Sequence, residues 1–515
     1  MIVILHKDDK VINILNHSSK EEIQTVNKNL VNVFFDLVER FRDTLIVWCD
    51  DDLKEFMNLT EFNAIFHHKL IMASFNTREF YYIDKRIGYV ESSPFINVNK
   101  KVTYPTWLMS SCIGGVNSDV LSCYNQRDYK NETFNYVLNS IAKRGIANGL
   151  FCYSAPKLLT NNSIASKVFK LSRFVLFKFI KEHYKGRWAF LTLFNCLVYE
   201  KRAVVLPFLR SIFTSRKFDK PNFEDLKIVA NKNVSTSKSS IDVIIPTIGR
   251  KDYLYDVLKD LGNQTLLPKN VIIIEQNPDM GSKSDLDYLQ NQSWPFHIKH
   301  TFINKTGACN ARNMALKQIE SDWVFMADDD IRFKKDILET ALNEMFNYKL
   351  NAATLSCLRK GDENIVRPML QWNTFGSGCS IVSKNIAQQI AFDIAFEHGF
   401  GEDGDYGMQI RNLGEDIGYI SKCNLEHLKA PIGGFRTKIT QSWQDDKIQP
   451  KPSPTITLFN LKNQTKEQIL GYKTLLFIKF FSNQKNKNIF SYFINMRKRW
   501  KRSVYWANKL KNATS

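Results

Sequence analysis

Short hydrophobic runs alternate with amphipathic stretches through the second half of the chain. The runs at residues 241–246, 270–275 and 323–331 are continuous, as expected for strands buried on both faces of a parallel sheet. Helical stretches are predicted at residues 251–261, 334–347 and 406–413, and directly after residues 304–313. Strands that alternate with helices in this way predict the α/β fold class with a doubly wound, mostly parallel sheet.

The run at residues 323–331 ends in three adjacent carboxylates, Asp328, Asp329 and Asp330. They would lie at the C-terminal end of a strand, where open α/β sheets bind their ligands. Adjacent carboxylates repel one another, and the local sequence offers nothing to neutralise them. A divalent metal would do so, and oxygen ligands of this kind suit Mg²⁺ or Mn²⁺. The alternative is a solvated acidic turn before the helix at residues 334–347.

The first 160 residues show a shorter version of the same pattern. Strands are predicted at residues 1–5, 11–15 and 44–49, and an amphipathic helix at residues 21–41. The third of these strands also ends in three carboxylates, Asp50, Asp51 and Asp52. Two interpretations stay open: a truncated, catalytically inert copy of the later domain, or a separate α/β domain with chance similarities.

Two later segments strengthen the parallel between the halves. Residues 112–115 (Cys-Ile-Gly-Gly) correspond to residues 376–379 (Gly-Ser-Gly-Cys), and residues 134–145 correspond to residues 400–414. The earlier copy has Asn135-Tyr136 where the later one has Glu402-Asp403, so it lacks the acidic pair.

A polar stretch marks the boundary between the halves of the chain. Residues 231–240 are small and polar, which is typical of a linker. We therefore expect an N-terminal α/β domain (1–160), a helical connector (161–230), the linker (231–240), the α/β domain with the acidic strand (241–445) and a basic tail (446–515).

Composition bounds these expectations without identifying a function. A chain of 515 residues with 44% hydrophobic residues is long enough for two or more domains. Its nine cysteines show no metal-binding spacing, which favours reduced thiols in a reducing compartment. Charged residues interrupt the apolar start at residues 6–10 and the most apolar stretch at 174–209, so we expect neither a signal peptide nor a membrane span. The expected location is the cytoplasm.

The net charge of +19 is concentrated in the tail. Eleven Lys and Arg residues follow Glu467 without any further carboxylate, and aromatic and aliphatic residues lie between them. This pattern is typical of basic amphipathic helices on an anionic membrane surface. The alternatives are a helix packed on the first domain, or nonspecific nucleic-acid binding, for which the chain carries no motif.

Five segments of the second half occur in an order that resembles the family 2 glycosyltransferases of the GT-A fold, over about residues 240–443. They are the end of the first strand at residues 246–250, the end of the second at 275–277, residues 304–313, the acidic strand, and residues 400–405 with 427–436. The resemblance implies a GT-A-type domain in the second half, and makes a degenerate GT-A-like copy one interpretation of the first.

The resemblance also implies a catalytic pair and a metal site. Asp403 would be the general base that deprotonates the acceptor hydroxyl, with Glu402 beside it at the start of a helix. Asp330, Asp328 and His427 would hold Mn²⁺ or Mg²⁺. The alternatives are that Glu402, Asp403 and Asp405 only cap the helix and that His427 is structural.

The remaining candidates would bind the substrates. The resemblance assigns the nucleotide sugar, with a UDP-sugar favoured, to Pro246, Thr247, Arg250, Glu275, Asn277, Gly307, Arg312, Asp328 and Asp329. The family commonly has Asp where this chain has Glu275 or Gln276. A wall for the sugar or acceptor is expected from Trp372, Phe375, Gly376 and Gly378, although the two aromatic residues could equally be core residues.

The expected function is a metal-dependent, inverting glycosyltransferase that moves a sugar from a nucleotide-diphosphate donor to a glycan or lipid-linked acceptor in surface polysaccharide or glycoconjugate synthesis. The alternative is a non-catalytic scaffold that binds sugar nucleotides or glycans. A sugar nucleotidyltransferase is disfavoured, because no Gly-rich phosphate loop follows the first strand.

Overall fold

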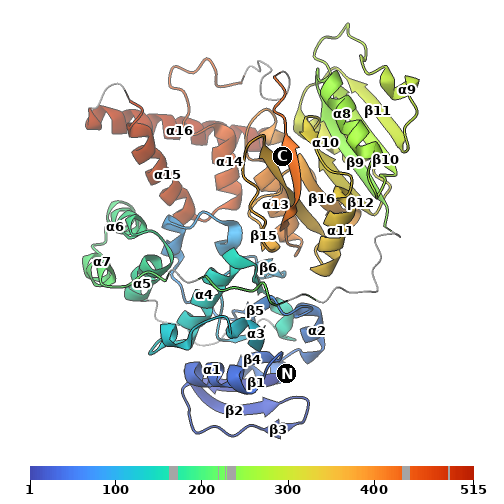
Figure 1. Cartoon of the computed structure of the whole chain (residues 1–515). Coiled ribbons are helices and arrows are strands. Elements are labelled where there is room, and N and C mark those ends of the chain that lie inside the picture. The colour runs from blue at the N-terminus through green and yellow to red at the C-terminus, as the bar shows by residue number, and fades with distance from the viewer. Residues whose placement is uncertain are drawn as a thin grey trace. The chain divides into compact units, whose positions relative to one another are not determined.

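The computed structural model describes residues 1–161, 172–217, 220–226, 228, 239–431, 441–484 and 488–514. The chain forms two compact units (Figure 1), the first made of Met1–Val229 with Gln464–Leu475 and the second of Ala230–Asn463 with Leu476–Ser515. The expected tail is therefore shared between the units rather than forming a region of its own. Residues 231–238 of the predicted linker lie outside the described residues.

The second unit is built on a mixed sheet in which the four neighbouring strands along one side are parallel. Its strands are β9 (Ile241–Thr247), β10 (Asn270–Gln276), β11 (His297–Ile303), β12 (Trp323–Ala327), β13 (Ile331–Arg332), β14 (Ala352–Arg359), β15 (Leu370–Gln371), β16 (Cys379–Ser383) and β17 (Gly418–His427). They lie in the order β11-β10-β9-β12-β16-β14-β17-β13, with β15 beside β17. The reversal of order around β9 and β12 creates the crevice in which doubly wound sheets bind ligands.

The described helices of the second unit are α8 (Lys251–Gly262), α9 (Tyr288–Asn291), α10 (Ala308–Leu316), α11 (Ile337–Asn347), α12 (Lys384–Ala387), α13 (Glu402–Asn412), α14 (Pro454–Asn463) and α16 (Ile489–Thr514). Four of them were predicted: α8 begins at its predicted residue and α11 three residues late, whereas α10, expected directly after residues 304–313, begins within that segment. α13 begins four residues earlier than the predicted 406–413, so Glu402 and Asp403 lie in its first turn. Residues of α10 and α13 share one core with β9, β10 and β12.

The C-terminal helices contribute to the core of the second unit. α14 packs against α13 and α16, and α16 also contacts residues 394–396. Leu458, Met496 and Ala507 are almost fully buried. Phe477 and Trp500 each expose less than a tenth of their surface. α15 (Lys466–Phe481) begins in the first unit and ends in the second.

The first unit contains a second mixed sheet. Its strands are β1 (Ile2–Lys7), β2 (Lys10–Asn16), β3 (Glu21–Glu22), β4 (Leu45–Asp50), β5 (Ile71–Phe75), β6 (Tyr104–Pro105), β7 (Ile113–Asn117) and β8 (Phe151–Ser154), in the order β3-β2-β1-β4-β7-β5-β8-β6. The predicted helix at residues 21–41 is shorter, because residues 21–22 pair as β3 and the Asn29 side chain caps α1 (Leu30–Arg40). α2 (Phe62–Ile65), α3 (Ser118–Leu121) and α4 (Phe134–Gly145) complete this part.

The strands of the two sheets correspond in order and direction. Along β1-β4-β7-β5-β8 the neighbours are parallel, antiparallel, antiparallel and parallel. The same sequence of directions runs along β9-β12-β16-β14-β17. The sheets differ at the edge, where β2 forms an antiparallel hairpin with β1 whereas β10 is parallel to β9.

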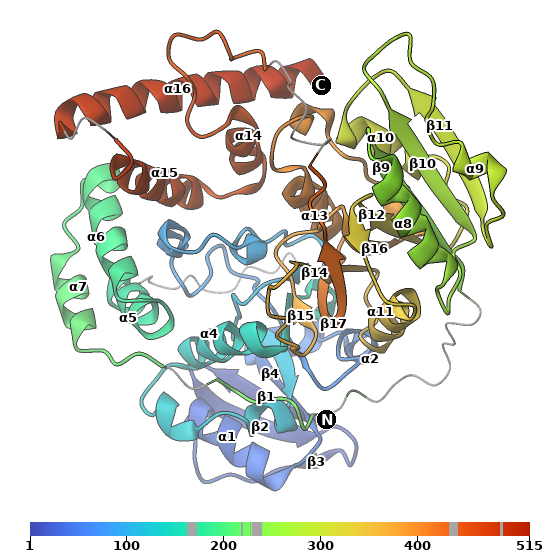
Figure 2. The same ribbon diagram turned by 45° about the horizontal axis from the view of Figure 1, so that its top comes forward.

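The described part of the predicted connector is helical. It forms α5 (Arg173–His183), α6 (Arg187–Glu200) and α7 (Val205–Ile212), which belong to the first unit and lie side by side (Figure 2). Among the described residues, no helix is both long and apolar enough to cross a membrane.

Candidate active site

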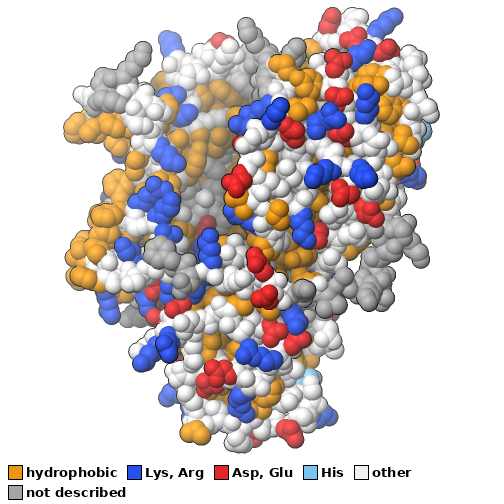
Figure 3. All heavy atoms as spheres, viewed as in Figure 1, with side chains coloured by type: hydrophobic (Ala, Val, Ile, Leu, Met, Phe, Trp, Pro, Cys, Tyr) orange, Lys and Arg blue, Asp and Glu red, His pale blue; other side chains and the backbone are white. Residues whose placement is uncertain are grey.

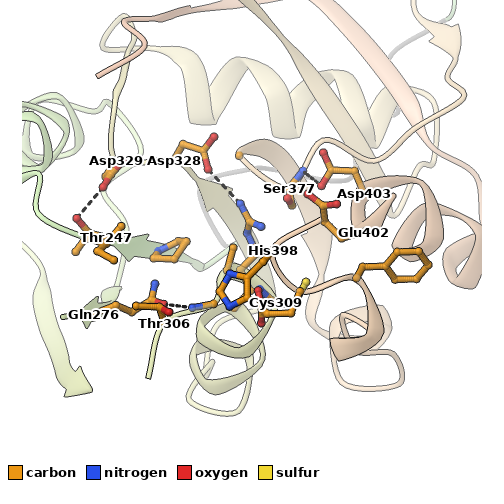
Figure 4. A pocket seen from close by; sticks show the side chains of 18 of the residues that line it. Thr247, Gln276, Thr306, Cys309, Asp328, Asp329, Ser377, His398, Glu402 and Asp403 are labelled. Carbon is orange, nitrogen blue, oxygen red and sulfur yellow. Dashed lines mark hydrogen bonds and ion pairs between the residues drawn. The ribbon is translucent and has the colours of Figure 1, made fainter. Parts of the chain in front are cut away.

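A cavity of about 390 Å³ opens at the C-terminal ends of β9, β10 and β12. Its walls come from these strand ends, the start of α10, the loop before β16, the segment before α13 and the end of β17. Of the predicted residues, the cavity is lined by Pro246, Thr247, Arg250, Gly307, Arg312, Asp328, Asp329, Asp330, Gly378, Glu402, Asp403 and His427. Asp328 and Asp329 lie on one side of it and Glu402 and Asp403 on another (Figure 4).

Arginine side chains from distant segments pair with the three carboxylates of the acidic run. Arg250 forms ion pairs with Asp329 and, at 3.3 Å, with Asp330. Arg312 lies 3.2 Å from Asp328. The positive charges that neutralise the run therefore come from distant segments, as well as from any metal that the site would hold. The local sequence could not reveal these partners, because they come from the end of β9 and from α10.

Asp329 differs in environment from its two neighbours. Its side chain is almost fully buried and accepts a hydrogen bond from Thr247 Oγ1 at 2.7 Å. Burial raises the pKa of Asp329 to about 6, although the Arg250 charge and the Thr247 hydroxyl act in the opposite direction. Its partners suit a role in holding Thr247 and Arg250 at the end of β9.

Asp328, Asp330 and His427 bring two carboxylates and an imidazole together. One ligand atom from each lies within 4.8 Å of those of the others. His427 Nε2 is 3.3 Å from Asp330 Oδ1, and the Ala430 N–H donates to Asp330 Oδ2 at 2.9 Å. Burial acts to raise the pKa of Asp330, but the bonds from His427 and Ala430 outweigh it and hold that pKa below its usual range. An ionised oxygen and nitrogen set of this kind fits Mn²⁺ or Mg²⁺.

A glycine gives Asp328 the room to face the cavity. A Cβ at Gly378 would lie 2.1 Å from Asp328 Oδ2, so no larger residue fits beside that carboxylate. The Asp328 backbone N–H also donates to the Gly378 carbonyl at 3.0 Å. Gly378 therefore acts through close backbone approach.

The acidic pair lies in the first turn of α13. The Ser377 backbone N–H donates to Asp403 Oδ1 at 3.1 Å, which fixes the direction of that carboxylate. Burial raises the pKa of Asp403, and the nearby Arg312 charge acts against this rise. Burial and the Asp403 charge raise the pKa of Glu402 to about 7. Both groups therefore hold protons more tightly than exposed carboxyls do, as expected of acid–base groups in a cleft.

Asp405 has a different task from the pair before it. It is almost fully buried and accepts hydrogen bonds from Lys462 Nζ and Asn463 Nδ2 of α14, both at 2.9 Å. It thus ties α14 to α13 rather than capping α13.

Five predicted residues lie outside the cavity lining. Glu275 accepts hydrogen bonds from Ser284 Oγ and pairs with His300 Nε2, while the Asn277 side chain accepts from the Asp279 N–H. Trp372 stacks on Tyr419 at 4.2 Å, and Phe375 is fully buried against Tyr406. The Gly376 N–H donates to Thr354 Oγ1. Phe375 therefore belongs to the core, which was the alternative interpretation, and Trp372 is half-buried and packs against that core.

Several cavity residues were not predicted. Gln276, next to Glu275, accepts a 2.6 Å hydrogen bond from the Gly307 N–H. Glu397 accepts bonds from the Cys309 and Asn310 N–H groups at 3.0 and 2.8 Å, at the N-terminus of α10. His398, with a φ of +58°, lies beside them. The polar segment Glu397-His398-Gly399, just before the acidic pair, was the sequence feature that could have predicted these cavity residues.

Comparison with known proteins finds a match to one family over part of the chain. Residues 242–405 match the model of Glycosyl transferase family 2. TuaG of Bacillus subtilis (strain 168), a glycosyltransferase whose name assigns it to teichuronic acid biosynthesis, is 29% identical over 108 residues. That match covers 21% of this chain and 42% of TuaG, so the chain spans under half the length of this relative.

Solved structures of glycosyltransferases are similar at low identity. S. aureus TarS 1-349 in complex with UDP-GlcNAc is 17% identical, with a TM-score of 0.38, over 52% of this chain and 81% of TarS 1-349. GalNAc-T7 with UDP, GalNAc and Mn²⁺ is 10% identical, with a TM-score of 0.30, over 38% of this chain and 44% of that protein. The family match and the strand order confirm the predicted GT-A-type fold of the second unit.

Proposed function

We propose that the protein transfers a sugar from a nucleoside-diphosphate donor, with a UDP-sugar favoured, to an acceptor hydroxyl with inversion, because residues 242–405 match the model of Glycosyl transferase family 2. One observation carries this proposal. The acidic pair of α13 and the Asp328, Asp330 and His427 set line the same cavity.

The donor would bind at the ends of β9, β10 and β12. Asp328, Asp330 and His427 would hold Mn²⁺ or Mg²⁺, and that ion would supply charge neutralisation for the departing diphosphate. Arg312 is buried beside Asp328 and adds a positive charge on that side of the cavity. Pro246, Thr247 and Arg250 would contact the nucleoside at the end of β9, where Asp329 fixes two of these side chains.

The acceptor would approach from the α13 side. Asp403, oriented by the Ser377 N–H, would accept the hydroxyl proton as that oxygen attacks the anomeric carbon. Attack from the side opposite the leaving diphosphate inverts the anomeric centre. Glu402, with a pKa of about 7, would be partly protonated near neutral pH, which limits its repulsion of the ionised Asp403.

The acceptor class is proposed from the name of one relative and from the tail. TuaG is named for teichuronic acid biosynthesis, which favours a role in surface polysaccharide assembly. A glycan or lipid-linked acceptor would suit a protein at the cytoplasmic face of a membrane. The exposed Ile489, Phe490 and Ile494 of α16, among the basic residues of the tail, support such a peripheral location. Phe477 and Trp500 are buried and would not insert.

The proposal is tested by incubating the protein with Mn²⁺ and a panel of nucleotide sugars while following nucleotide release. We expect slow hydrolysis of one donor, and Asp403→Asn should reduce it at least roughly a hundredfold while donor binding persists. Binding of a donor without turnover of any would favour the non-catalytic scaffold. Loss of donor binding in Asp403→Asn would show that Asp403 is a donor contact instead.

A further inference from the structure

The outward faces of α6 and α7, in the first unit, are apolar. Side chains that hydrophobic helices normally bury are turned to solvent here, with exposed fractions of 90% for Phe213, 72% for Leu206 and 64% for Phe190. Figure 3 shows hydrophobic side chains gathered over these two helices, with Lys and Arg beside them. Contiguous apolar patches of this kind mark interaction surfaces.

α6 has one buried face and one exposed face. Phe190, Phe194, Leu197 and Val198 are exposed at the i, i+4, i+7 and i+8 spacing of one helix face. The buried face carries Asn195, whose side chain accepts a 2.7 Å hydrogen bond from Thr474 Oγ1. Ala189, Leu191 and Cys196 of the same face belong to the core of the first unit, so α6 is fixed there while a second hydrophobic stripe is left outside.

α7 continues the same surface. Leu206, Leu209 and Ile212 are exposed at helical spacing beside Val205 and Phe213. Its opposite face is fixed by Phe208, whose ring packs against Phe177 and lies 4.7 Å from the ring of Phe190. The patch is therefore a formed surface held on packed helices.

The charged residues of the segment that carries the patch are almost all positive. Between Ser172 and Lys217 the chain has ten Lys and Arg residues but two carboxylates, Glu182 and Glu200. Glu182 is buried and accepts from Tyr136 Oη at 2.6 Å, and Glu200 accepts from the Arg86 guanidinium at 2.8 Å. Both are thus engaged within the unit, whereas the cations at Lys185, Arg187, Lys201, Arg202, Arg210 and Arg216 are exposed.

We propose that the α6–α7 surface docks on an anionic lipid bilayer. Its apolar side chains would enter the acyl boundary while the surrounding cations contact the lipid headgroups. A second copy of the chain is a poorer occupant, because a two-fold interface would place this cation-rich surface against itself. The inference concerns the first unit and does not depend on the proposed transfer reaction.

Vesicle co-sedimentation tests the proposal with the full-length chain. In Leu206→Gln/Phe213→Gln both replaced side chains are exposed, so the fold should persist. Its partition onto phosphatidylglycerol-containing vesicles should fall at least about tenfold. The matched control, Ile365→Gln/Val366→Gln, removes apolar residues that are 55% and 64% exposed in the second unit, and it should bind like the wild type.

Charge is tested separately with Arg202→Glu/Arg210→Glu, which should also weaken binding at least about tenfold at low salt and less at high salt. The wild type should bind phosphatidylcholine vesicles much more weakly than anionic ones. Unchanged circular dichroism and unchanged donor hydrolysis would show that the variants are folded. Hydrolysis is measured without vesicles, so its result does not depend on membrane binding.

Three results would overturn the proposal. The first is wild-type sedimentation of both patch variants. The second is loss of sedimentation only in Phe490→Gln/Ile494→Gln, which would assign the membrane contact to α16 alone. The third is a lipid-free dimer of the wild type that the Leu206→Gln/Phe213→Gln variant dissociates, which would make the patch a contact between copies.

Discussion

At the scale of single residues, the cavity depends on carboxylates that differ in environment although they are neighbours in sequence. Asp328 faces the cavity beside Gly378, Asp329 is buried against Thr247 and Arg250, and Asp330 is held by His427 and the Ala430 N–H. Each should therefore respond differently to removal of its charge.

Asp330→Asn tests the proposed metal site. We expect Mn²⁺-dependent donor binding, measured by calorimetry, to weaken at least about a hundredfold. Removing a residue that hydrogen-bonds to a metal ligand can weaken metal binding by up to about a hundredfold, and removing the ligand itself should weaken it at least as much. Since Asp330 is buried and paired with Arg250, a fall in unfolding free energy on the order of 1 kcal/mol is expected as well. Full activity of the wild type in EDTA would rule out metal dependence.

Glu402→Gln tests the raised pKa of Glu402. The pKa of Glu402 is about 7 in the folded protein and about 4.3 in the unfolded chain. The protonated Glu402 side chain therefore favours the folded state at low pH, and this contribution to the free energy of unfolding is lost as pH rises through about 7. Gln stays neutral, so the variant should match the wild type in urea unfolding near pH 4. Near pH 8 it should be more stable by on the order of 2 kcal/mol. Glu363→Gln, at an exposed position, is the control and should show no such pH-dependent gain.

At the scale of elements, α14 packs closely against α13, which carries Glu402 and Asp403. A Cβ at Gly399 would lie 2.4 Å from Thr455 Cγ2 and one at Gly404 would lie 2.8 Å from Phe459 Cε2, so glycines allow this approach. α16 then covers α14, where Thr457 Oγ1 and Ser503 Oγ share a 2.6 Å hydrogen bond. Removal of the chain from Gln468 onward would therefore strip packing from the second unit, and it is a poor test of membrane binding.

Asp405→Ala should loosen this support. It leaves Lys462 and Asn463 without the buried carboxylate, and we expect a loss of about 2–3 kcal/mol in unfolding free energy, together with faster hydrogen exchange in α14. Asp393→Asn, which acts on the outer side of the same lysine, is the matched control and should cost under about 1 kcal/mol. Equal losses in both variants would contradict the assigned role of Asp405.

Sequence patterns predicted most elements that form the cavity, and the reason is local. Continuous apolar runs specify β9, β10 and β12, and the acidic run follows directly from the last of them. Contacts between distant segments left no such signal. Arg250 reaches Asp329 across 79 positions and Lys462 reaches Asp405 across 57, and neither pairing follows from periodicity. Phe375 could not be assigned to core or cavity, because an aromatic residue before a glycine suits both.

At the scale of the whole molecule, the two sheets repeat one arrangement of strands, but the first sheet places different side chains at the corresponding positions. The Ser111 N–H donates to Asn135 Oδ1 at 3.0 Å, as the Ser377 N–H does to Asp403. Arg78 lies 3.5 Å from Asp50, the first carboxylate of its own acidic run. We therefore propose that the first unit is a catalytically inert relative of the second.

Replacing Asp50, Asp51 and Asp52 by Asn tests this proposal. Turnover per folded molecule should stay within about twofold of the wild type, because the first unit has the amide Asn135 at the position that corresponds to Asp403. Some loss of thermal stability is expected from the Asp50–Arg78 pair. Asp328→Asn in the second unit, measured in parallel, should abolish turnover. A strong loss of turnover by the folded triple variant would reveal a second working site.

The return of Gln464–Leu475 to the first unit affects how the protein can be made. Gln468 Nε2 donates to the Glu91 and Ser93 carbonyls, and Gly471 packs so closely against Tyr89 that a Cβ would lie 2.4 Å from its carbonyl oxygen. During synthesis, the contacts of Gln464–Leu475 with the first unit can form only after most of the second unit has left the ribosome. The N-terminal half expressed alone would expose the surface that Gln464–Leu475 normally covers. Chaperone dependence should therefore be greatest for chains that stop between residues 229 and 464.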